Sequence, residues 1–114
     1  MELRYYQTAD RRQPFPEWLA ALNDAAARAR IRARLTRLIA GNFGDSEPVG
    51  DGVMELRVDW GPGYRVYFAR LGQVVVLLLC AGDKRTQDKD IKRAKGYFRD
   101  YKTRTAQEKR RGSR

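Results

Sequence analysis

The sequence predicts a small α+β domain, in which a mainly antiparallel sheet carries an N-terminal helical hairpin on one face and is followed by a C-terminal helix. Segments with a helical apolar period (14–23 and 25–42) come first, and segments that alternate as strands do (53–60 and 64–70) come later. Helices and strands grouped in separate blocks are typical of α+β proteins. The 114 residues suffice for one core. The expected order is β-α-α-β-β-β-α.

The N-terminal part contains one expected strand and two expected helices. The stretch ELRYYQT (2–8) is rich in β-formers and precedes a breaker-rich loop, which predicts the first strand. The helix over 14–23 has its apolar residues on one face: Phe15, Trp18, Leu19 and Leu22. Asp24 can cap the helix over 25–42. Five arginines cover the polar side of that helix, as a solvated face or as a guide for a nucleic acid or an acidic partner.

Three further strands are expected in the central part of the chain. Residues 43–52 have the composition of a loop. Residues 53–60 and 64–70 alternate, and the Gly-Pro-Gly between them predicts a tight turn. The stretch VVVLLLC (74–80) is apolar on both sides, which favours a place inside the sheet.

The last helix is expected over residues 86–102. Thr86 can cap it, and acidic residues in its first turn suit the positive end of the helix dipole. Residues 104–114 are highly charged and have no apolar stripe, which predicts a disordered basic tail. The folded domain is therefore expected to span residues 1–103.

Composition restricts the function further. There are 24 Lys and Arg against 14 Asp and Glu, and the net charge of +10 favours phosphate polymers or an acidic protein as partners. The chain has no histidine and one cysteine, so no metal site and no cofactor are expected. No apolar run approaches the roughly 20 residues of a membrane helix, and no signal peptide precedes the domain. A cytoplasmic protein without membrane contact is expected.

A cluster of polar residues is expected on the sheet face that the helical hairpin leaves open. Arg57, Arg65 and Tyr67 share that face on neighbouring strands. The loop after the buried strand adds Lys84 and Arg85 at its rim, beside the N-terminus of the last helix. Such a set suits a phosphodiester: the arginines would hold the phosphate, Lys84 would stabilise charge or move a proton, and Tyr67 would stack a base or donate a proton.

Three stretches then resemble a known family. GNFGD (41–45), ELRVDWGPGYRVYF (55–68) and VVVLLLCAGDKRTQDKDIKRAKGYFRDY (74–101) are similar to the addiction-module killer proteins of the RelE/HigB superfamily, which are toxins of bacterial type II toxin–antitoxin pairs. The resemblance extends over residues 1–103 and implies a RelE-like fold. It also implies a metal-independent endoribonuclease (mRNA interferase) that cuts mRNA on the translating ribosome, and a cognate antitoxin, expected to be a helix-turn-helix protein.

The resemblance also assigns residues. By position, Arg57, Arg65 and Lys84 match basic positions around the scissile phosphate. Asp90 falls near the position at which some relatives have a catalytic Tyr or another acid–base group, and it completes the expected catalytic set. The expected RNA-binding residues are Tyr67, Arg85 and Lys89.

Two other functions fit the same sequence. One is a ParE-like poison of DNA gyrase, which needs no group of residues to align a phosphate. The other is a non-catalytic RNA-binding module, for which the positive charge alone would suffice.

Overall fold

A single five-stranded sheet forms the centre of the protein, and the computed structural model describes residues 1–112. The strands are β1 (Glu2–Tyr5), β2 (Ser46–Gly50), β3 (Val53–Val58), β4 (Tyr64–Leu71) and β5 (Val75–Asp83). Their order across the sheet is β1-β5-β4-β3-β2. Strand β1 runs parallel to β5 and the other neighbours are antiparallel, so the sheet is mixed. The predicted α+β class and the mainly antiparallel sheet are confirmed.

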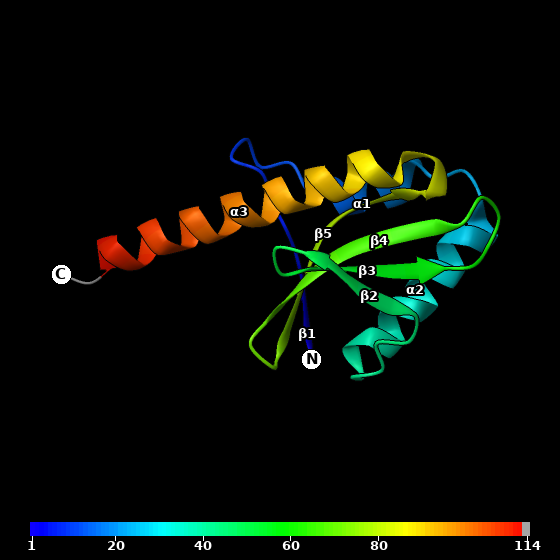
Figure 1. The fold of residues 1–114 in the computed structure, drawn as a ribbon, viewed down its shortest axis with the longest axis horizontal. Coiled ribbons are helices and arrows are strands. Elements are labelled where there is room, and N and C mark those ends of the chain that lie inside the picture. Colours follow the sequence, from blue (N-terminus) through cyan, green and yellow to red (C-terminus); the bar gives the residue numbers. More distant parts are fainter. Residues whose placement is uncertain (113–114) are drawn as a thin grey trace.

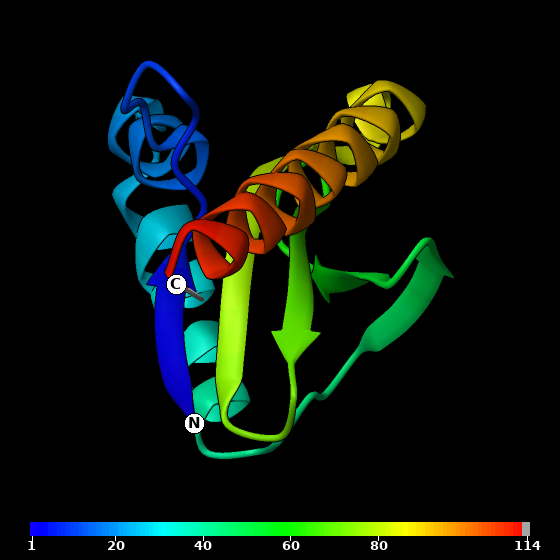
Figure 2. The ribbon, with the colours of Figure 1, turned by 90° about the vertical axis from the view of Figure 1, so that its left-hand side faces the viewer.

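Helices cover both faces of the sheet (Figures 1 and 2). Helices α1 (Pro14–Ala21) and α2 (Ala25–Ile39) pack on one face, as predicted, against apolar residues of β3, β4 and β5. Helix α3 (Gln87–Gly112) follows a 3₁₀ turn, η1 (Lys84–Thr86), and packs on the other face. Within residues 1–112, no helix has the length and apolar character needed to cross a bilayer.

The second sheet face is therefore not open, which corrects the expectation from the sequence. Ala94 and Phe98 of α3 form a second core with Tyr67, Leu77 and Leu79 of the sheet. A bulge between β4 and β5 pairs Tyr67 with Cys80 but Phe68 with Leu78, so the extra residue lets both Leu79 and Cys80 face α3. The end of this face near the β3–β4 turn carries the polar side chains of Arg57 and Arg65.

Strand β2 lies within residues 43–52, which were expected to form a loop. Pro48 cannot donate a backbone hydrogen bond, but β2 is the edge strand, where proline is tolerated. The Asp51-Gly52 turn that joins β2 to β3 has positive φ at both residues (56° and 81°), as a tight two-residue hairpin turn requires. The predicted order therefore lacked one strand.

Helix α3 also continues beyond the predicted boundary at residue 103. Residues 104–112 are helical, so the expected disordered tail is wrong over this range, and residues 113–114 lie outside the described part of the chain. The Arg104 guanidinium bonds to the Asp100 carboxylate at 2.7 Å and to the backbone oxygen of Gln7, which ties the extension to the body. The rest of α3 projects past the sheet (Figure 1).

Candidate functional site

Three predicted basic residues meet at the end of the sheet near the β3–β4 turn. Arg57 of β3 and Arg65 of β4 are directly paired in the antiparallel register. Lys84 begins η1, and its backbone N–H donates to the Gly63 carbonyl oxygen at 2.8 Å, which holds η1 beside that turn. Three separate segments of the chain thus bring their cations to one place.

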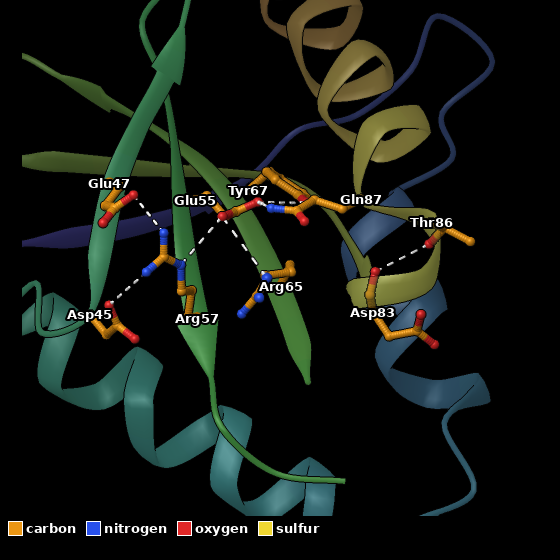
Figure 3. Close-up of polar contacts among 9 residues, drawn as sticks. All are labelled: Asp45, Glu47, Glu55, Arg57, Arg65, Tyr67, Asp83, Thr86 and Gln87. Atoms are coloured by element: carbon orange, nitrogen blue, oxygen red, sulfur yellow. Dashed lines mark hydrogen bonds and ion pairs between the residues drawn. The ribbon is translucent and has the colours of Figure 1, made fainter. Parts of the chain in front are cut away.

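A buried carboxylate, Glu55, lies beside both of the facing arginines. Like charges directly opposite each other in a sheet are destabilising. The Glu55 carboxylate lies 3.7 Å from Arg57 Nε and 4.0 Å from Arg65 Nε, and its residue is 2% exposed. The Tyr67 hydroxyl donates to it at 3.0 Å and Gln87 Nε2 donates at 2.9 Å (Figure 3). Glu55 is therefore the centre of a buried polar cluster that orients both guanidinium groups.

The three cations differ in how many contacts their side chains already make with carboxylates of the protein. Arg57 also contacts Glu47 at 2.5 Å and Asp45 at 3.6 Å, so three carboxylates surround it (Figure 3). The Arg65 side chain makes no hydrogen bond within residues 1–112, and its Nε is buried without an acceptor in bonding geometry. The Lys84 ammonium is exposed and has no ion pair in the described part of the chain. Arg65 and Lys84 consequently hold the donors that a ligand can use.

These residues line one hollow of about 340 Å³. Its walls are formed by Asp45, Arg57, Asp59, the turn Gly61–Gly63, Arg65 and Lys84. Three cations and two carboxylates face the space, so an oxyanion has donors and a proton acceptor lies beside it. Asp59 is exposed, and it has no partner among residues 1–112. We call this hollow the site cavity.

Tyr67 does not belong to the site cavity. Its side chain is fully buried between the sheet and α3, which leaves no ring face for a base to stack on. Burial first, and then the negative charge of Glu55, raise the pKa of the Tyr67 hydroxyl far above its ordinary value. The predicted roles in stacking and proton donation do not fit this position; Tyr67 instead holds Glu55.

Asp90 is also separated from the predicted catalytic arginines. Its carboxylate is buried, accepts a hydrogen bond from Thr86 Oγ1 at 2.6 Å and pairs with Arg93 at 3.1 Å. It lines a different hollow of about 220 Å³ together with Lys89. Gly82 packs so closely on it that an added Cβ would lie 1.9 Å from Asp90 Oδ2. The contacts of Asp90 are those of a residue that fixes the start of α3.

The remaining predicted residues lie around η1. Arg85 and Lys89 are exposed and line a shallow hollow of about 370 Å³, which Lys84 joins to the site cavity. Arg85 pairs with Asp83 at 2.8 Å, and this contact lowers the pKa of the Asp83 carboxyl. Asp83 also caps η1 by accepting from the Arg85 backbone N–H. The chain's own carboxylate thus caps η1, the turn that leads into α3.

Sequence reasoning missed the acidic half of the site. Glu55, Arg57 and Asp59 alternate along residues 53–60, the strand expected from the sequence, so the sequence already places these carboxylates on the same side as Arg57. Two features could not be predicted from the sequence. The burial of Glu55 depends on α3 covering this face of the sheet, and Asp45 reaches Arg57 from the loop before β2. Within residues 1–112, no group of three or more acidic or cysteine side chains is arranged to hold a metal ion.

Comparison with known proteins identifies a relative, but the name of that relative does not state an activity. No family model matches the chain. An uncharacterized protein of Haemophilus influenzae is 57% identical over 81 residues, which cover 71% of this chain and 82% of that protein. The matched share of both chains is large enough to include most of the fold. The chain belongs to the same protein family as this Haemophilus influenzae protein.

Proposed function

We propose that this protein is the toxin of a type II toxin–antitoxin pair, an endoribonuclease that cleaves mRNA at the site cavity on the translating ribosome and so inhibits translation. The observation that carries the proposal is the convergence of Arg57, Arg65 and Lys84, from three segments, on one cavity in which the donors of Arg65 and Lys84 are unused. The resemblance to the RelE/HigB superfamily includes these three residues. A cognate antitoxin would neutralise the toxin by covering this surface.

The chemistry follows from the groups that line the cavity. Arg65 and Lys84 bind the non-bridging oxygens of the phosphate, and Arg57 fixes the wall beside them. The Asp59 carboxylate accepts the proton of the ribose 2′-OH, whose oxygen forms a bond to phosphorus. The bond from phosphorus to the 5′-oxygen breaks, and the Lys84 ammonium gives that oxygen a proton. Asp59 then releases its proton to water and Lys84 takes one from water, which restores both groups. The products are a 2′,3′-cyclic phosphate and a 5′-hydroxyl.

Replacing Lys84 tests this proposal without disturbing the fold. Lys84 is exposed and unpaired in the described part of the chain, so Lys84→Gln should fold as the wild type does. Lys92→Gln, which removes an exposed charge of α3 away from the hollows around η1, is the matched control. We expect new mRNA 5′ ends in cells that express the wild type or Lys92→Gln, and about 100-fold fewer with Lys84→Gln.

The same cells distinguish the other functions. Toxicity with unchanged mRNA ends and relaxed, damaged DNA would replace the proposal with a gyrase poison. Salt-dependent binding of RNA, with no new mRNA 5′ ends in a translating extract, would show that the protein is a non-catalytic RNA-binding module.

A further inference from the structure

Helix α2 carries a concentrated positive charge that the protein does not neutralise. Its 15 residues include five arginines and no acidic residue. These are Arg28, Arg30, Arg32, Arg34 and Arg37. Within residues 1–112, none of them forms an ion pair, whereas Arg57, Arg65 and Arg85 around the site cavity each face a carboxylate. Repulsion within this set is a cost to stability, which suggests that the face serves a ligand.

Three of the five arginines share one stripe of the helix. Arg30, Arg34 and Arg37 follow one another at i, i+4 and i+7, which spans about 10 Å along the axis. With Ala33 and the end of β3 they line a hollow of about 230 Å³. The Arg30 guanidinium, which lines the hollow, lies 3.8 Å from the centre of the Trp60 ring, and this stacking holds it in place.

This hollow adjoins the site cavity. Asp59 lines both of them. An RNA strand that has a phosphate at Arg65 and Lys84 and continues past Asp59 would therefore reach the α2 stripe next. All cations of the stripe are arginine, whose planar fork bonds two phosphate oxygens at once, while the compact ammonium of lysine acts as a point charge.

We propose that the α2 stripe (Arg30, Arg34 and Arg37) binds the backbone phosphates of the RNA strand on one side of the cleaved bond. This inference rests on the proposed function, because it places the cleaved phosphate in the site cavity. It predicts that substitutions in the stripe do not change the affinity for RNA that is too short to extend beyond the site cavity.

Binding of RNA of two lengths tests the stripe. The probes are a fluorescent 2′-O-methyl trinucleotide and a dodecamer, which lack the attacking hydroxyl and stay intact. Arg37→Gln removes an exposed member of the stripe, and Arg32→Gln removes an exposed arginine from the opposite side of the same helix. Both variants lose one charge, and neither side chain has a partner within residues 1–112.

The stripe predicts a difference between these two variants. For the dodecamer, Arg37→Gln should weaken binding about fivefold in low salt and reduce the slope of log Kd against log salt by about 0.7, as the loss of one phosphate contact does. Its trinucleotide affinity should be unchanged, and Arg32→Gln should match the wild type with both probes. Equal losses of dodecamer affinity in the two variants, or a loss of trinucleotide affinity in Arg37→Gln, would refute the proposed role of the stripe.

A poly-glutamate competitor shows whether the stripe binds RNA or an acidic protein. If Arg37→Gln loses affinity for the peptide but not for the dodecamer, the stripe binds a protein and our inference is wrong. The proposed function can fail separately: length-dependent binding through Arg37 without any RNA cleavage supports the stripe and refutes the nuclease.

Discussion

Replacement of the buried carboxylate, Glu55→Gln, should destabilise the protein and disorder its arginines. The ion pair with Arg65 at 4.0 Å is worth about 4 kcal/mol of Coulomb attraction at an effective dielectric constant of about 20. Removing one partner of a buried pair costs about 3–5 kcal/mol. The Arg65 side chain is 13% exposed, so the loss should fall at the low end, about 3 kcal/mol.

Urea unfolding measures this loss. With an m value of about 1.5 kcal/mol/M, the midpoint should move down by about 2 M at unchanged m. The control is Glu47→Gln, which removes an exposed carboxylate from Arg57 and should cost less than about 1 kcal/mol. If both variants lose equally little stability, Glu55 does not organise the site electrostatically, and our account of how Arg65 is held is wrong.

Three other substitutions or modifications test the buried surroundings of the site. Tyr67→Phe removes the hydroxyl that bonds Glu55, so the free energy of unfolding should fall by about 1.5–3 kcal/mol while RNA cleavage persists; loss of cleavage in a folded variant would show that Tyr67 does reach the substrate. Gly82→Ala forces a methyl group onto the Asp90 carboxylate, so the same free energy should fall by about 1–3 kcal/mol, and a thermal midpoint equal to that of the wild type would contradict this packing. Burial raises the pKa of the Cys80 thiol to about 12, so iodoacetamide at about pH 8 should label the unfolded chain and leave the native protein unlabelled, as mass spectrometry can establish.

The sequence was sufficient for the elements with a strong local pattern. Alternation identified β3 and β4, the helical period identified α1 and α2, and the apolar run identified β5 as a strand inside the sheet. Strand β2 was missed because its Pro and Gly residues weaken any strand pattern, although the Asp51-Gly52 pair is a hairpin signal.

The site could be predicted only in part. The meeting of Arg57, Arg65 and Lys84 follows from hairpin geometry, which fixes residues that face each other in neighbouring strands. The burial of Tyr67 and the position of Asp90 outside the site cavity both depend on where α3 packs. The apolar pattern of a helix does not indicate which sheet face the helix covers. For the same reason the sequence does not show that Glu55 is buried.

The extension of α3 shows a further limit. Residues 104–112 lack an apolar stripe because most of them have no core to face, so their pattern resembles that of a disordered segment. Their helix continues from an already formed helix, which avoids the unfavourable nucleation step. The hydrogen bond from Arg104 to Asp100 adds support at spacing i, i+4.

The central claim is that the site cavity cleaves RNA by attack of the ribose 2′-OH. The most direct measurement uses a messenger with one 2′-deoxynucleotide at the mapped cut, translated by ribosomes in the presence of the purified protein. We predict that the unmodified messenger is cut to a 2′,3′-cyclic phosphate and a 5′-hydroxyl, and that the deoxy-substituted messenger stays intact at that position. Cleavage of the deoxy-substituted messenger there, or a 5′-phosphate on the product, would contradict the account.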